Sequence, residues 1–170
     1  LKELCDYWIT KFDWSKHESE MNKFKNYTTN IDGIKIHFIK KKGSSENSEP
    51  LLLMHGWPGS IIEFLNIIEK LAHPEKFGGN ENDSFDVIVP SLPGFGFSGG
   101  PSKPMGPRKM AEILNKLMIE SLGYKDYMAQ GGDWGATIAN WLGYDHSNFC
   151  KAIHINLSLI HISEPTRRGI

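Results

Sequence analysis

One short motif places a carboxylate where a nucleophile could stand. The sequence G-G-D-W-G at residues 131–135 lies between an apolar strand expected over 126–130 and a helix expected from Ala136. This layout is typical of a nucleophile elbow, with Asp133 in the position of the nucleophile. A helix N-terminus favours the ionised carboxylate, which can attack carbon without a base to activate it. The alternative is that Asp133 only caps the helix, a position that Asp prefers.

A second motif, H-G-W-P-G-S at residues 55–60, follows another apolar strand and precedes another helix. A fold with such an elbow keeps its second oxyanion donor at this location. The backbone N–H groups of Trp57 and Trp134 could then converge on one oxygen that develops negative charge. The two motifs together predict an oxyanion hole beside Asp133.

Other residues of these motifs are interpreted as structural support. His55 directly follows an apolar strand, so we expect a hydrogen-bonded structural residue and not a catalytic base. Pro58 fixes its turn, and the bond before proline is the kind that can be cis. Glycines let the backbone approach closely where a side chain would collide. The supporting set is His55, Gly56, Pro58, Gly131, Gly132 and Gly135.

Two further patterns, a glycine-rich segment and the scattered histidines, are assigned neither a catalytic nor a binding role. The segment P-G-F-G-F-S-G at residues 93–99 has G-x-G-x-x-G spacing. It follows a later strand and runs into Gly100-Pro101 and not into a helix, so we expect a structural turn and not a dinucleotide site. The remaining histidines lack the spacing of a metal site, and neither a metal nor a cofactor is predicted.

Short apolar runs alternate with helical patterns after Pro50. Strands are expected over 51–54, 86–90, 126–130 and 151–156. Helices are expected from Ser60, over 107–121 and from Ala136. Ser60 and Glu63 form a capping box at the start of the first of these helices. Strands without alternation are buried on both faces, which predicts a largely parallel sheet between helices. Before this region we expect short aromatic helices over residues 1–30 that pack on something larger, and a half-exposed strand over 34–38.

Composition limits the classes of function. The chain has 170 residues, 39% of them hydrophobic and 23% charged, with a net charge of −1. This predicts one globular domain without the basic field that nucleic acid or an anionic membrane would require. No apolar stretch reaches ~18 residues and no signal peptide is recognised, so the soluble class of protein is expected and not a membrane-spanning one. Because the sequence begins at Leu1, a membrane anchor could have been lost from its N-terminus.

The end of the chain differs from the rest. Residues 157–167, L-S-L-I-H-I-S-E-P-T-R, resemble the translation of a transposase-type sequencing adapter. We therefore expect residues 157–170 to be foreign and the native sequence to reach only Asn156 within this chain.

Taken together, the motifs resemble those of the microsomal and juvenile-hormone epoxide hydrolases of the α/β-hydrolase superfamily. The resemblance covers residues 6–156 and rests on D-W at 13–14 and on segments 31–39, 55–60, 90–98 and 130–135. It implies an N-terminal meander over 1–42 that wraps the hydrolase domain, and the N-terminal half of an α/β-hydrolase domain over 50–156. The fold would then be truncated after the elbow helix and the strand that follows it.

The resemblance also implies a reaction. Asp133 would open an apolar epoxide to give an alkyl ester, and water would hydrolyse that ester to a diol while Trp57 and Trp134 hold the oxyanion. Such enzymes act in detoxification or juvenile hormone catabolism at the microsomal membrane of the endoplasmic reticulum. Their lid tyrosines, catalytic acid and base histidine lie downstream of the elbow and have no match here. We therefore expect this chain alone to be insoluble or molten and inactive.

Two other functions remain open on sequence grounds. A haloalkane dehalogenase-like hydrolase also uses an Asp elbow, and a tryptophan at the position of Trp134 can bind halide. The other is a non-catalytic protein with the same fold, such as a ligand carrier.

Overall fold

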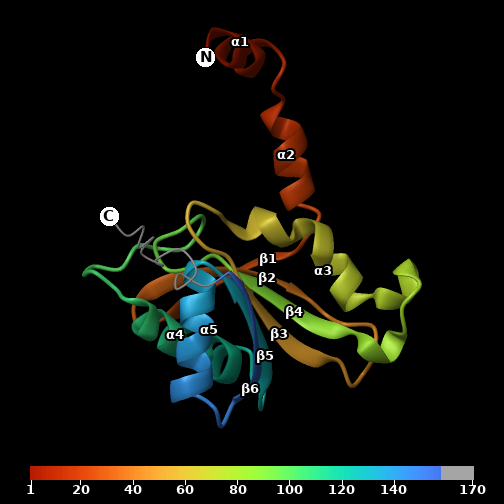
Figure 1. Cartoon of the computed structure of the whole chain (residues 1–170), viewed down its shortest axis with the longest axis vertical. Coiled ribbons are helices and arrows are strands. Elements are labelled where there is room, and N and C mark those ends of the chain that lie inside the picture. The colour runs from red at the N-terminus through yellow and green to blue at the C-terminus, as the bar shows by residue number, and fades with distance from the viewer. Residues whose placement is uncertain (158–170) are drawn as a thin grey trace, which may run out of the picture.

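In the computed structural model, which describes residues 1–157, six strands form one sheet in the order β1-β2-β4-β3-β5-β6 (Figure 1). Strands β4, β3, β5 and β6 are parallel, whereas β1 and β2 form an antiparallel hairpin that joins the sheet beside β4. The predicted α/β class and largely parallel sheet are confirmed. The strands are β1 Asn26–Ile31, β2 Ile34–Lys41, β3 Glu49–Met54, β4 Phe85–Pro90, β5 Tyr127–Gly132 and β6 Cys150–Leu157. The predicted foreign tail lies outside the described residues, except for Leu157.

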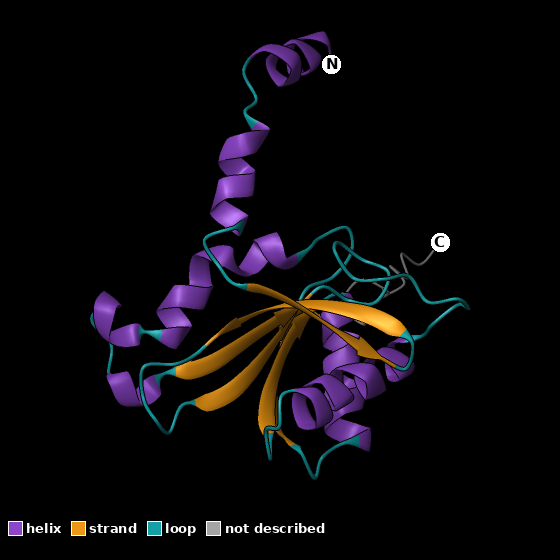
Figure 2. Cartoon of the chain, turned by 180° about the vertical axis from the view of Figure 1, so that it is seen from behind, coloured by secondary structure: helices purple, strands orange, loops and turns teal. Residues whose placement is uncertain are grey.

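Helices cover both faces of this sheet (Figures 1 and 2). One face carries α3, and the opposite face carries α4 and α5, which pack on each other. Two further helices, α1 and α2, precede the sheet. Their bounds are α1 Lys2–Thr10, α2 Trp14–Met21, α3 Leu65–Ala72, α4 Pro107–Lys116 and α5 Trp134–Asp145, with 3₁₀ turns at Ile61–Phe64, Pro74–Phe77 and Glu81–Asp83 and a π turn at Leu117–Ser121. The predicted helix from Ser60 therefore begins as a 3₁₀ turn.

The central strands are buried on both faces because their side chains contribute to two separate hydrophobic cores. Leu52 and Ile88 pack towards α4 and α5, whereas Leu53 and Val87 pack towards α3. Neighbouring residues of a strand point to opposite faces, so a continuous apolar run supplies both cores at once. This explains why these strands lack an alternating pattern.

The prediction for the first strand region is wrong in two respects. The strand expected to be half-exposed is β2, and its residues from Ile36 to Ile39 are buried, His37 among them. The reason is that β2 lies inside the sheet, between β1 and β4. Strand β1 was not expected at all, because its polar sequence N-Y-T-T-N-I carries no strand pattern.

Helices α1 and α2 project away from the sheet (Figure 1). No residue of α1 is buried, and the side chains of Tyr7, Trp8 and Trp14 are exposed. The D-W pair has a local role, since the Asp13 carboxylate caps α2 by accepting a hydrogen bond from the N–H of Ser15 at 3.0 Å. These aromatic side chains are exposed within residues 1–157, so their wrapping of the hydrolase domain stays a prediction.

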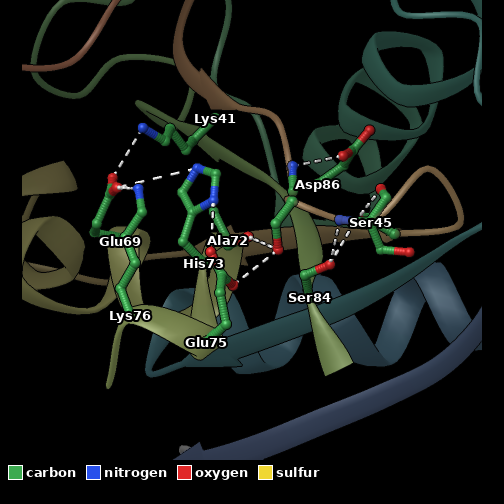
Figure 3. A network of polar contacts seen from close by, with 12 residues as sticks. Lys41, Ser45, Glu69, Ala72, His73, Glu75, Lys76, Ser84 and Asp86 are labelled. Carbon is green, nitrogen blue, oxygen red and sulfur yellow. Dashed lines mark hydrogen bonds and ion pairs between the residues drawn. The ribbon is translucent and has the colours of Figure 1, made fainter. Parts of the chain in front are cut away.

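A polar network fastens the end of the sheet remote from the elbow (Figure 3). Lys41 on β2 forms an ion pair with Glu69 on α3 at 2.9 Å. In the loop after β2, the Ser44 hydroxyl donates to Glu75 at 3.0 Å and to the carbonyl of Ala72 at 3.3 Å. These contacts hold the end of α3 against the loop between β2 and β3.

Asp86 is a buried carboxylate in this region. Its carboxylate accepts hydrogen bonds from the N–H of Gly43 at 2.9 Å, from Lys42 at 2.9 Å and from the hydroxyl of Tyr124 at 3.0 Å. Burial and this carboxylate raise the pKa of Tyr124, so the phenol stays protonated as a donor. Asp86 therefore connects β4 to the loops on either side of it.

We expect Asp86→Ala to lower the free energy of unfolding of the intact protein by about 3 kcal/mol, because it leaves buried donors without an acceptor. Urea denaturation measures this change. The exposed Asp83→Ala is the matched control and should change stability by less than about 0.5 kcal/mol. Equal effects of the two substitutions would contradict this role of Asp86.

Candidate active site

The turn between β5 and α5 holds Asp133 in a strained backbone conformation. Its φ is 51° and its ψ is −121°, in a region that residues other than glycine rarely adopt. A Cβ atom at Gly131 would lie less than 3.0 Å from the carbonyl of Gly135, and one at Gly135 equally close to the carbonyl of Met54. The turn is thus as tight as an elbow requires, and it lifts the side chain of Asp133 above the sheet edge.

The Asp133 carboxylate faces the 55–60 loop and not its own helix. The N–H of Trp57 donates a hydrogen bond of 2.8 Å to Oδ1 of Asp133. The side chain makes no capping bond, and it is the backbone carbonyl of Asp133 that accepts from the N–H groups of Ala136 and Thr137. The two motifs, 76 residues apart in sequence, therefore meet at one carboxylate oxygen.

Close approach of this loop depends on a missing side chain. A Cβ atom at Gly56 would lie less than 3.0 Å from Oδ1, Cβ and Cγ of Asp133. The following Trp57-Pro58 peptide bond is cis, and the indole of Trp57 is 68% exposed, so the backbone and not the ring of Trp57 faces the carboxylate.

Trp134 is the first residue of α5. The first N–H groups of a helix have no acceptor within it. Among residues 1–157 the Asp133 carboxylate receives one hydrogen bond, from Trp57, so the structure does not show the N–H of Trp134 bonded to it. The indole of Trp134 packs against the core formed with α4 and α5.

His55 is buried and both of its ring nitrogens are occupied. Leu92 donates its N–H to Nε2 at 3.1 Å, which leaves Nδ1 to donate to the carbonyl of Gly56 at 3.0 Å. Burial lowers the pKa of His55, in keeping with a neutral ring. The ring also contacts Phe95 edge to face, so His55 links the 55–60 loop to the loop after β4.

The loop with G-x-G-x-x-G spacing closes on itself and on β2. The N–H of Gly94 donates to the carbonyl of Gly99 at 2.9 Å, and the N–H of Gly99 donates to the carbonyl of Lys35 at 2.7 Å. The hydroxyl of Ser98 bonds the carbonyl of Ser91 at 2.7 Å. This is the structural turn that was expected.

A cavity of about 390 Å³ opens in front of Asp133. Two residues that the sequence analysis did not assign to the site, Glu63 and Asn156, line it. Asn156 lies near the carboxyl end of β6, the strand next to β5. A polar residue at this end of a predicted parallel strand was the signal in the sequence that could have identified it. Glu63 was interpreted only as a capping residue. The described lining is Gly56, Trp57, Pro58, Gly59, Glu63, Gly132, Asp133 and Asn156.

Neither a metal site nor a membrane helix is found among residues 1–157. No group of three or more His, Cys, Asp and Glu side chains there could hold a metal ion. None of the helices in this range is long and apolar enough to cross a membrane.

Comparison with known proteins identifies the families that the chain matches. Residues 1–64 match the family model described as epoxide hydrolase N terminus, and residues 49–167 match the model described as alpha/beta hydrolase fold. A putative epoxide hydrolase of Stigmatella aurantiaca is 45% identical over 161 residues, which are 94% of this chain and 36% of that protein. Juvenile hormone epoxide hydrolase 1 of Ctenocephalides felis is 42% identical over 163 residues, 88% of this chain and 34% of that protein.

Solved structures agree with these sequence matches. The epoxide hydrolase of Aspergillus niger superposes with a TM-score of 0.79 and 36% identity over 90% of this chain and 39% of that one. The chain thus spans little more than a third of the length of the relatives it matches.

We expect Gly135→Ala to destabilise the intact protein by about 3 kcal/mol or more, because the added methyl group would overlap the backbone of β3. Thermal or urea unfolding measures the loss. Gly100→Ala is the control, since a Cβ atom there meets no atom within 4 Å. A Gly135→Ala protein as stable as the control would show that the elbow is not packed as tightly as described.

Proposed function

The chain belongs to the α/β-hydrolase family and corresponds to the N-terminal part of its microsomal and juvenile-hormone epoxide hydrolases, and on this basis we propose that the whole protein converts apolar epoxides to vicinal diols. Asp133 is the nucleophile, and the backbone N–H groups of Trp57 and Trp134 form the oxyanion hole. Water is the second substrate, and no cofactor takes part.

One observation carries this proposal above all others. Asp133 occupies a strained position that the adjacent glycines permit, and its carboxylate is bound by the Trp57 N–H and does not cap α5. A carboxylate with only a capping role would need neither the strain nor the contact with a loop 76 residues away. Strain of this kind is typical of functional positions.

The geometry assigns different tasks to the two carboxylate oxygens. Oδ1 is held by the Trp57 N–H, so Oδ2 is the atom free to attack an epoxide carbon. The carbon–oxygen bond of the epoxide breaks as the new bond to Oδ2 forms, and the departing oxygen takes a proton from an acid outside residues 1–157, the lid tyrosines of the family pattern. The product of this step is an ester of Asp133.

The second step regenerates the carboxylate. Water adds to Cγ of Asp133 and gives its proton to a base, and negative charge develops on Oδ1. The Trp57 N–H already lies against this oxygen, and the N–H of Trp134 is the second donor that we assign to it. Collapse of the intermediate breaks the bond between Cγ and Oδ2, and Oδ2 takes the proton from the protonated base and leaves as a hydroxyl group of the diol.

The described residues supply only part of this machinery. No histidine lines the cavity in front of Asp133, and both ring nitrogens of His55 are used within the fold. Strand β6 is an edge strand whose residues 151–154 are exposed, and an apolar groove of about 640 Å³ lies between it and α3. We therefore propose that the isolated 170-residue chain is poorly folded and inactive.

The substrate class and location extend the same proposal. An apolar epoxide, either a juvenile-hormone-like lipid or a foreign compound, fits the relatives that the chain matches. Attachment to the endoplasmic reticulum membrane follows from the family resemblance and would require an anchor outside residues 1–157.

We expect Asp133→Ala to lower diol formation by the full-length protein about a thousand-fold or more, because the covalent step loses its nucleophile. Chromatography of the diol from an aryl-alkyl epoxide measures this rate. Asp83→Ala, at an exposed position away from the elbow, is the matched control and should retain activity. A fully active Asp133→Ala protein, or a full-length protein without activity on any apolar epoxide, would contradict the proposal.

We also propose that native sequence ends near Asn156 within this chain and that residues 157–170 derive from a sequencing adapter. Sequencing of the native transcript through the codon for Asn156 tests this. We expect it to continue into a lid segment, an acid and a histidine. A transcript that encodes L-S-L-I-H-I-S-E-P-T-R up to a stop codon would overturn it and favour a non-catalytic protein.

A further inference from the structure

Asp133 lies between two neighbouring strands, and each contributes one residue to its surroundings. Strand β5 pairs with β3 on one side and with β6 on the other, all three parallel. Beyond the end of β3, Trp57 binds Oδ1 of Asp133. Near the end of β6, Asn156 lines the same cavity from the opposite side. The site therefore has a second polar group on the side away from the oxyanion donor.

A local irregularity of the sheet singles out Asn156. Gly131 pairs with Ile155 and Gly132 pairs with Leu157, so Asn156 is the extra residue between two consecutive pairs. A shift of this kind changes which residues of the two strands lie side by side, and bulges are common beside active sites. Asn156 keeps the alternation of β6, with Ile155 packed towards α4 and α5 and Asn156 on the α3 side with Gln130.

The Asn156 side chain lies against the backbone just before Asp133. A Cβ atom at Gly132 would lie 2.7 Å from Oδ1 of Asn156, so a larger residue at 132 would push the amide away. The Gln130 Nε2 group donates to this same Oδ1 at 3.3 Å. With Oδ1 used as an acceptor towards β5, the Nδ2 group is the end of the amide that can donate into the cavity.

We infer that Asn156 is a positioning residue for hydrolysis of the Asp133 ester, and that its Nδ2 group donates a hydrogen bond to the water that attacks Cγ. This inference rests on the proposed function. The water oxygen forms the new bond to Cγ, its proton passes to the imidazole base supplied downstream, and the alkyl oxygen leaves as the diol hydroxyl. Asn156 gains and loses no proton in this step. Its part is to hold the water on the β6 side while Trp57 holds Oδ1 on the β3 side.

The test uses two substitutions in the full-length protein. Asn156→Asp keeps the shape and the acceptor for Gln130 but removes the Nδ2 donor. Asn156→Ala removes the donor without adding charge beside Asp133. We expect both to slow ester hydrolysis about ten-fold, the worth of one hydrogen bond, while formation of the ester stays within about two-fold of wild type.

Steady-state and rapid-quench kinetics separate the two steps. Slower hydrolysis lowers kcat and KM together, leaves kcat/KM unchanged, and increases the fraction of enzyme trapped as the Asp133 ester. A purely structural role would lower the melting temperature without this parallel change. Asn140→Asp, at an exposed position of α5, is the matched control and should leave both constants unchanged.

The possible outcomes are distinct. Accumulation of the ester in both Asn156 variants supports the inference. Hydrolysis of the ester at the wild-type rate in either variant overturns it and leaves the proposed function standing. A wild-type protein that forms diol without any ester on Asp133 overturns the covalent mechanism and this inference together.

Discussion

The hydrogen bond between the Trp57 N–H and the Asp133 carboxylate is the contact on which the rest of the site depends. It requires β3 and β5 to be adjacent and parallel, so that the loops following them meet at the same sheet edge. It also requires a backbone approach that any side chain at Gly56 would prevent. The two cores on either face of the sheet hold these strands in register, and the positive φ of Asp133 then directs the carboxylate to the loop.

The same contact decides what the site can do. An oxygen already bound by a backbone donor is poorly placed to attack a substrate, so in the proposed mechanism Oδ2 attacks and Oδ1 carries charge in the hydrolytic step. His55, although next to the site in sequence, serves to fix the donor loop by two hydrogen bonds. In the proposed mechanism, the described residues supply the nucleophile and the electrostatic part of the reaction, and the proton-transfer groups lie outside residues 1–157.

Much of the fold and of the turn at Asp133 could be predicted from the sequence, because short glycine motifs and apolar runs act on the local backbone. The G-G-D-W-G motif predicted the turn at Asp133, and the apolar runs predicted two-sided burial of the central strands. The burial of His37 was missed because it depends on the position of β2 inside the sheet, which no local pattern records. Asn156 was missed for a related reason, since its place beside Gly132 depends on the pairing of β5 with β6. Sequence spacing therefore predicted the turn that holds Asp133, whereas the neighbouring position of Asn156 came only from the pairing of the strands.

The most direct test of the covalent role of Asp133 is a single turnover of an apolar epoxide by the full-length protein in water labelled with ¹⁸O. If Oδ2 leaves in the diol and water replaces it, mass spectrometry will find the label in the peptide that contains Asp133 and not in the diol. Label in the first diol formed, with an unlabelled Asp133 peptide, would mean that water attacks the epoxide directly. Asp133 would then not be a nucleophile, and this account of the site would be wrong.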